Sequence, residues 1–231
     1  METQLDKIKD ITKQYLHRPV EPVGLLMVDH PVFASAFVGP KLTLEQLQNR
    51  GSLGDLDFYT VLNPDGLKKA TANYEEIIDK TDSASQLAIL IQGRYRLQWL
   101  GDIRPYLSGC DFASILNVAW VSGVAKDIEE AFRWFESCKP DELMSESELA
   151  VFNNIPNEIT LYRGVKKGLR DDGLSWTDDI SIAEWFVTRH GDHGHVLKMI
   201  AKKEEILAYF DSRQEREYIV YPHNYEVLKE L

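Results

Sequence analysis

A pair of glutamates near the end of the chain has the spacing of a reactive site. In the segment SRQEREYIVYP, residues 212–222, Glu215 and Glu217 stand one residue apart at the start of an apolar run. In an extended strand, alternate residues point to the same face, so the two carboxylates would converge on one spot. A carboxylate placed there suits a general base or a binding group for a guanidinium. The spacing alone is compatible with a chemical site at this strand entrance, and the case for one depends on the segments that accompany it.

Two earlier segments offer side chains that complement these carboxylates. The segment LYRG at 161–164 carries Arg163, a permanent cation with a forked donor geometry that suits phosphates. Gly164 follows it and, lacking a Cβ, allows close approach of another group to the backbone. The segment LSWT at 174–177 adds the hydroxyls of Ser175 and Thr177. Each segment lies at the edge of an expected strand, so all three could meet at one place in a sheet.

In their order and content, the three segments resemble the R-S-E class of mono-ADP-ribosyltransferases, over about residues 159–222. These enzymes split NAD and attach ADP-ribose to a protein. In the family, an arginine ends the first strand, an S-T-S triplet opens a strand-to-helix turn, and a Glu-x-Glu or Gln-x-Glu pair precedes an apolar strand. Here the triplet is Ser175-Trp176-Thr177, with tryptophan in place of the middle threonine. Ala183 and Phe186 also suit the family's helix after the triplet.

The resemblance implies catalytic roles for Glu217, Ser175 and Glu215. Cleavage of the bond between nicotinamide and ribose creates an oxocarbenium-like cation, which a neighbouring carboxylate stabilises. Glu217 would take that role and hold a ribose hydroxyl, while Ser175 would hydrogen-bond to Glu217 and orient it. Glu215 would activate the nucleophile. Family members with glutamate at this first position typically modify arginine, so the expected acceptor is an arginine of a target protein whose identity the sequence does not reveal.

The resemblance also implies an NAD-binding set. Arg163 would bind the phosphates or the adjoining ribose, and Gly164 would let the nicotinamide amide approach the backbone. Trp176 and Thr177 complete the expected set, Trp176 being the best candidate for an aromatic contact with the ligand. NAD is expected as a substrate, and no metal is expected: the histidines of RHGDHGH, residues 189–195, have no recognised zinc spacing. If the resemblance holds, Arg189 in this segment falls where the family approaches the NAD phosphates.

Each of these residues has an ordinary structural interpretation too. The glutamates could be solvated strand residues, Arg163 an exposed charge at a strand end, and Ser175 and Thr177 turn residues. Trp176 could simply pack. At the level of function, an NAD glycohydrolase and a non-catalytic protein-binding module with vestigial motifs remain alternatives to the transferase. The intact set of arginine, serine and glutamate argues against the binding module.

The elements that must position these residues indicate an α+β protein. Apolar residues recur at helical spacing over 3–16, 43–50, 66–79, 85–99, 113–123 and 127–137. After about residue 155 short β-branched and aromatic runs follow, at 159–165, 174–177, 195–201, 206–210, 217–221 and 225–228. We expect a helical region of unknown role at 1–105 and an ADP-ribosyltransferase-like catalytic domain at 106–231. The resemblance implies a small mixed or antiparallel split sheet in that domain.

Three helix starts have the capping-box spacing, in which a Ser or Thr side chain and a Glu or Gln three residues later satisfy each other's backbone amides. They begin at Thr43, Ser145 and Ser181, with Gln46, Glu148 and Glu184 as the respective partners.

Composition limits the partners. The 231 residues include 37 acidic and 26 basic side chains, giving a net charge of −11. No Lys/Arg block is long enough to follow a phosphate backbone, so duplex nucleic acid is not an expected partner. The first residues lack the apolar core of a secretion signal, and no stretch is apolar enough to cross a membrane. We expect a cytoplasmic protein of the producing or host cell; by analogy with bacterial toxins and phage proteins, it could modify host machinery.

Overall fold

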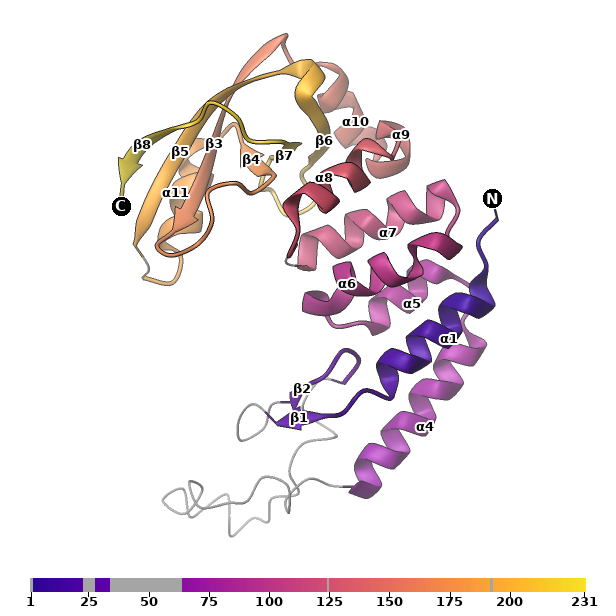
Figure 1. Ribbon diagram of the computed structural model, residues 1–231. Coiled ribbons are helices and arrows are strands. Elements are labelled where there is room, and N and C mark those ends of the chain that lie inside the picture. The colour runs from indigo at the N-terminus through magenta and orange to yellow at the C-terminus, as the bar shows by residue number, and fades with distance from the viewer. Residues whose placement is uncertain (1, 23–27, 34–63, 124, 192) are drawn as a thin grey trace, which may run out of the picture. The chain divides into compact units, whose positions relative to one another are not determined.

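The computed structural model describes residues 2–22, 28–33, 64–123, 125–191 and 193–231 (Figure 1). The chain forms two compact units, Met1–Val124 and Ala125–Leu231. The division lies after the helix Gly109–Ser122, which packs on two other helices of the first unit. The boundary that we expected near residue 105 is therefore corrected to about residue 124, because tertiary contacts place this helix with the earlier helices and not with the sheet.

The first unit is mainly helical in its described part, with one short two-stranded sheet. Its elements are α1 (Leu5–Leu16), β1 (Glu21–Pro22), β2 (Val28–Asp29), α4 (Pro64–Lys80), α5 (Ala84–Leu90), α6 (Gly93–Ile103), the 3-10 turn η2 (Arg104–Tyr106) and α7 (Gly109–Ser122). The helix expected at 43–50, with Thr43 and Gln46, lies outside the described residues.

The single helix expected at 85–99 is two helices, α5 and α6. The backbone of Ile91 and Gln92 is extended, with ψ of 129° and 138°, which ends one helix before the next begins. The Arg96 side chain closes this break, because its Nε donates to the carbonyls of Ala88 at 3.0 Å and Ile91 at 2.8 Å. Apolar periodicity continues through the break, so the sequence pattern alone does not reveal it.

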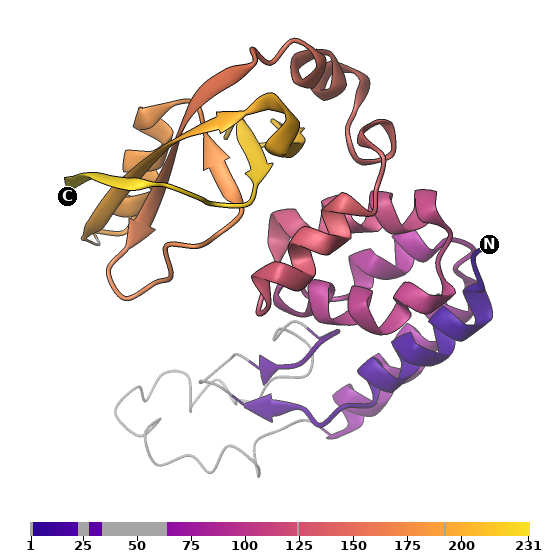
Figure 2. The same ribbon diagram turned by 45° about the horizontal axis from the view of Figure 1, so that its top comes forward.

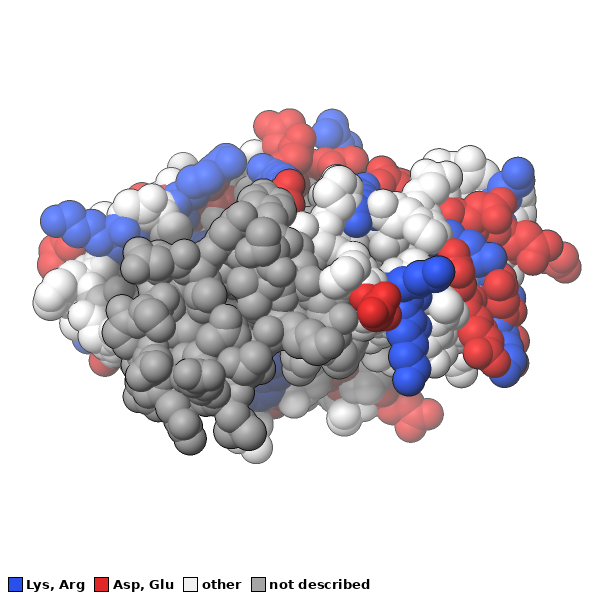
Figure 3. Space-filling view, turned by 90° about the horizontal axis from the view of Figure 1, so that it is seen from below, with Lys and Arg blue, Asp and Glu red and all other residues white. Residues whose placement is uncertain are grey.

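The surface of α1 and α4 carries charges of both signs. Lys13 pairs with Asp79 at 2.6 Å, and His17 contacts Glu75 at 2.9 Å. Figure 3 shows acidic and basic side chains interleaved toward the right of the view. Exposed pairs of this kind contribute little stability, but the mixture of signs does not offer a phosphate backbone a uniformly basic track.

The second unit is built on a six-stranded antiparallel sheet in the order β6-β7-β4-β3-β5-β8 (Figures 1 and 2). Its strands are β3 (Glu158–Lys166), β4 (Ser175–Thr177), β5 (Gly194–Lys202), β6 (Ile206–Phe210), β7 (Glu217–Val220) and β8 (Glu226–Glu230). Its helices are α8 (Ile128–Glu136), α9 (Pro140–Leu143), α10 (Glu146–Asn153) and α11 (Ile180–Thr188), and η3 (Lys203–Glu205) is a 3-10 turn. The fold is therefore mixed α and β, as the sequence predicted.

The sheet consists of two three-stranded groups that meet at one residue pair. β3 pairs with β5 along its whole length, whereas β3 and β4 share only the pair Tyr162–Thr177. The group β6-β7-β4 is thus joined to the group β3-β5-β8 at this point alone. This junction positions the candidate site, because Arg163 lies next to Tyr162 on one strand and Ser175 lies two residues before Thr177 on the other.

Helix α11 covers one face of the sheet at this junction. Ala183 and Val187 on the helix are fully buried against Val196 of β5. Asp179 caps the helix: its Oδ1 accepts hydrogen bonds from the amide of Ser181 at 2.9 Å and from its hydroxyl at 2.6 Å. The capping box expected at Ser181 is therefore wrong, since the helix begins one residue after Asp179. Glu184, its expected partner, instead binds Lys229 of β8.

Candidate functional site

The first feature of the site is a side-chain contact between β4 and β7. Thr177 lies directly opposite Glu217, and Ser175 lies opposite Ile219. Paired residues of antiparallel strands direct their side chains to the same face, so Ser175 and Glu217 are diagonal neighbours. The Ser175 hydroxyl donates a hydrogen bond to Glu217 Oε1. This is the contact that the resemblance implied, and both residues are partly exposed.

Arg163 binds the same strand from β3. Its Nη1 donates to the carbonyl oxygen of Ser175 at 2.8 Å. Its Nε is buried and has no hydrogen-bond partner in the described part of the chain. Burial lowers the pKa of the guanidinium, and the negative charge of Glu217 acts in the opposite direction. An arginine remains charged at neutral pH even so, which makes the side chain a cation beside the Ser175–Glu217 contact.

Arg163 is covered by the segment between β3 and β4. Gly173 lies against its guanidinium so closely that a Cβ there would stand 2.1 Å from Nη2. A group as large as a phosphate would reach Arg163 only if the backbone near Gly173 moved aside.

Gly164 has a packing role that the sequence did not predict. A Cβ at this position would stand 1.9 Å from the carbonyl oxygen of Ala183, so the missing side chain is what allows α11 to lie on β3. We expected Gly164 to admit the nicotinamide amide to the backbone. The space beside its Cα is filled by the helix, so the structure gives this glycine a packing role, and its expected contact with nicotinamide through the backbone stays a prediction.

Trp176 and Thr177 are buried as well. The Trp176 side chain is 2% exposed, and its Nε1 donates to the carbonyl of Gly173 at 2.9 Å. Its ring lies 6.1 Å from that of Tyr225. The expected ligand contact is therefore corrected to a packing role, since Trp176 points away from the face that carries Ser175. Thr177 is 5% exposed and its Oγ1 accepts from the amide of Asp179 at 3.2 Å, which fixes the turn into α11.

Glu215 lies outside the strand. β7 begins at Glu217, and the residues on either side of Glu215 have positive φ, 60° for Gln214 and 46° for Arg216. The argument that Glu215 and Glu217 share a face assumed an extended backbone, so it does not apply here. Glu215 instead pairs with Arg213, whose Nη2 lies 2.6 Å from Glu215 Oε2.

The turn that presents the two glutamates is anchored at both ends. Asp211 Oδ1 accepts from the amide of Arg216 at 3.0 Å, and the Asp211 carbonyl accepts from the amide of Gln214 at 2.9 Å. The Arg216 guanidinium binds Asp178, which also accepts from the Tyr218 hydroxyl at 3.1 Å. These contacts allow the turn to hold two residues in the left-handed region, where an ordinary side chain is disfavoured.

Glu148 on α10 anchors the start of this turn. The predicted capping box of Ser145 and Glu148 is confirmed: Glu148 Oε2 accepts from the Ser145 amide at 2.9 Å and hydroxyl at 2.7 Å. Its other oxygen accepts from the amide of Asp211 at 2.8 Å. Burial by itself raises the pKa of Glu148, but these hydrogen bonds outweigh it and bring the pKa below the ordinary value of 4.5.

We expect Glu148→Gln to lower the free energy of unfolding of the second unit by about 1–3 kcal/mol, because an amide group cannot accept all of these donors. The depressed pKa sets the sign of the pH dependence. The carboxylate contributes fully above pH 4.5 and its contribution is lost as the pH falls through the lower folded value. Urea unfolding of both proteins between pH 3 and pH 7 measures this. A difference that stays constant over the whole range would contradict it.

Some residues around the site carried no sequence signal. His195 Nε2 lies 2.8 Å from Asp171 Oδ1, which ties the segment between β3 and β4 to β5. Asp178 and Arg213 were also not predicted from the sequence, because their contacts join segments that are distant in the chain or irregular in backbone. Arg189, expected near the NAD phosphates, lies over the rings of Trp185 and Phe186, 5.1 and 4.7 Å from their centroids. That is a cation–π contact on α11, so the expectation for Arg189 is corrected.

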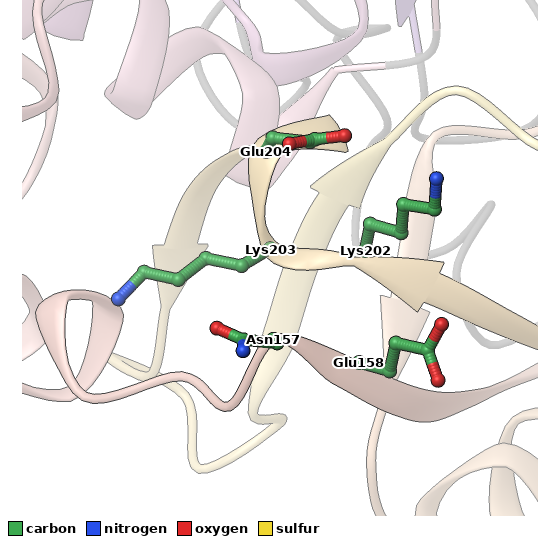
Figure 4. A pocket seen from close by; sticks show the side chains of 5 residues that line it. All are labelled: Asn157, Glu158, Lys202, Lys203 and Glu204. Atoms are coloured by element: carbon green, nitrogen blue, oxygen red, sulfur yellow. The ribbon is translucent and has the colours of Figure 1, made fainter.

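A pocket elsewhere in the second unit lies where β3 begins and β5 ends. It is lined by Asn157, Glu158, Lys202, Lys203 and Glu204 (Figure 4). Figure 4 shows the Lys203 side chain extended away from that of Lys202, and its amine donates to the carbonyl of Asn153. The motif residues of the candidate site are absent from this lining.

The described residues contain no cluster of three or more His, Cys, Asp or Glu side chains that could hold a metal ion. Within the same residues, each helix is too short or too polar to cross a membrane. Comparisons with protein-family models, with curated proteins and with solved structures found no match for this chain.

Proposed function

We propose that the chain is a mono-ADP-ribosyltransferase that cleaves NAD and transfers ADP-ribose to an arginine of a target protein. The observation that supports this most is the contact of Ser175 with Glu217, together with the bond from Arg163 to the carbonyl of Ser175. Three residues that are distant in sequence are thereby joined at the junction of the two strand groups. This arrangement supports the proposal, because the resemblance implied that these three motifs meet in space.

The proposed chemistry assigns one task to each residue. The carboxylate of Glu217 stabilises the positive charge that develops on the ribose as nicotinamide leaves. Ser175 holds this carboxylate in place by donating its hydroxyl proton. Arg163 contributes a fixed cation beside this contact, and it would bind the anionic part of the dinucleotide directly if the backbone near Gly173 moved aside. Glu215 accepts the proton that the acceptor guanidinium loses when its nitrogen bonds to the ribose carbon.

Glu215→Gln separates transfer from hydrolysis. We expect it to reduce labelling of lysate proteins by about 10²-fold or more, the usual contribution of a general base. Release of nicotinamide should fall far less, since water can still attack the ribose. The experiment incubates wild type and variant with NAD labelled in the adenosine part and a cell lysate, and measures protein label and free nicotinamide.

The matched control is Glu226→Gln, which removes an exposed carboxylate from β8 and should change neither readout. Nicotinamide release without protein label in the wild type would instead identify an NAD glycohydrolase. If wild type yields neither product at any lysate concentration, the proposed function is wrong. Equal labelling by wild type and Glu215→Gln would refute the role of Glu215 alone.

A further inference from the structure

Asp178 binds the residues on both sides of the proposed catalytic carboxylate. Its Oδ2 accepts a hydrogen bond from the Tyr218 hydroxyl at 3.1 Å. The same oxygen accepts from Nη2 of Arg216, which completes an ion pair. Arg216 and Tyr218 directly precede and follow Glu217 in the chain. One oxygen atom therefore restrains both chain neighbours of Glu217 from a segment that is distant in sequence.

Asp178 is itself held in place on both sides. Before it, Thr177 pairs with Glu217 across β4 and β7. After it, Asp179 caps α11 and donates its amide to Thr177 Oγ1 at 3.2 Å. The Asp178 side chain is short and only 16% exposed. A side chain fixed in this way between a strand and a helix start suits the support of a reactive group, which must be held in one geometry.

This support matters because the chain before Glu217 is irregular. Gln214 and Arg216 have φ of 60° and 46°, and β7 begins only at Glu217. Ser175 binds the carboxylate at the tip of the Glu217 side chain, whereas Asp178 restrains the segment from which that side chain extends. A displacement of about 1 Å in a catalytic group can cost about 10²-fold in rate. The contacts of Asp178 therefore bear on the distance from carboxylate to ribose, on which the proposed stabilisation depends.

We propose that Asp178 is a positioning residue for the cleavage of NAD: through Arg216 and Tyr218 it sets where the carboxylate of Glu217 stands. This rests on the proposed function. Asp178 need not touch the dinucleotide to act in this way. Its removal should therefore lower the rate of the chemical step and leave the binding of NAD unchanged.

The test compares steady-state NAD cleavage by the full wild-type chain and by Asp178→Asn. Asparagine keeps the shape and an acceptor oxygen for Tyr218, but it loses the charge that binds Arg216. We expect kcat for nicotinamide release to fall by about 10- to 10²-fold, while KM for NAD changes by less than about twofold. Asp179→Asn is the matched control, because it removes the same charge from the next residue and asparagine caps a helix equally well. It should leave kcat and KM unchanged.

Action through Glu217 predicts a second result. In the Glu217→Gln background, Asp178→Asn should lower kcat by less than about twofold, because the carboxylate that Asp178 positions is already gone. A residue that merely stabilises the fold would cost as much in this background as in wild type. A loss of the same size in both backgrounds would therefore overturn the inference.

Tyr218→Phe tests one of the two contacts alone. It removes the hydroxyl that binds Asp178 and keeps the ring, which packs on Tyr209. We expect a smaller fall in kcat with KM unchanged. This variant decides the matter if urea unfolding shows that Asp178→Asn does not fold, and an unchanged kcat would then overturn the positioning role.

Failure of this inference differs from failure of the proposed function. An unchanged kcat in folded Asp178→Asn, or a raised KM with kcat unchanged, would overturn the positioning role and leave the NAD chemistry intact. If the wild-type chain releases no nicotinamide, the inference and the proposed function are both wrong.

Discussion

Glu217→Gln should reduce nicotinamide release from NAD by about 10²–10³-fold, the loss typical when one electrostatic stabiliser of a transition state is removed. Glutamine has nearly the same shape, and its amide oxygen can still accept from Ser175. What disappears is the negative charge beside the ribose. The initial rate of nicotinamide formation by the purified chain, at saturating NAD, measures this effect.

Thermal unfolding of the same variant serves as the control, because the loss of rate must not come from loss of fold. We expect a small change in melting temperature, since Glu217 is only partly buried and keeps its hydrogen bond. A variant that releases nicotinamide as fast as wild type would remove Glu217 from the mechanism. It would also leave the Ser175–Glu217 contact as a purely structural bond between strands.

Gly164→Ala should destabilise the second unit by about 3 kcal/mol, at the upper end of the usual cost of overpacking. The added methyl group would stand 1.9 Å from the carbonyl oxygen of Ala183. That oxygen belongs to the backbone of α11, so no side-chain rotation relieves the clash and the helix must move off β3. Urea unfolding, followed by tryptophan fluorescence, measures the change; three of the five tryptophans, Trp134, Trp176 and Trp185, lie in the second unit.

Gly168→Ala is the comparison for this prediction. Gly168 has a φ of +85°, and a Cβ there would meet nothing within 4 Å. Its substitution therefore costs only the backbone strain of a left-handed residue, about 1–2 kcal/mol. If Gly164→Ala costs no more than Gly168→Ala, then α11 accommodates the methyl group, and the close approach of helix and strand is not what requires glycine.

Strand positions followed closely from the sequence. The expected strands at 159–165 and 206–210 correspond to β3 and β6 within one residue at each end. Short β-branched and aromatic runs between turn residues are a local signal, and each run pairs with neighbours of similar character. The capping box at Ser145 was also predictable, because both of its partners lie within four residues. The cap of α11 was not, since Asp179 and Ser181 both suit a helix start.

The candidate site was predictable only in part. The order of Arg163, Ser175 and Glu217 predicted that they meet, and hydrogen bonds join them in this order. Strand alternation did not predict the position of Glu215. Arg216 adopts a positive φ, so the backbone between the two glutamates is not extended, and the contacts of Arg216 with Asp178 and Asp211 explain this conformation.

The residue sequence by itself determined which segments become strands and helices of the second unit and which side chains are available for chemistry. These depend on local periodicity, turn residues and residue type. Tertiary structure alone decided that Gly164 allows α11 to pack on β3, that Trp176 is buried, and that Arg213 forms an ion pair with Glu215. The physical reason is that each of these outcomes depends on atoms of a packed neighbour or on an irregular backbone. Neither of these produces a periodic pattern of residue types in the sequence.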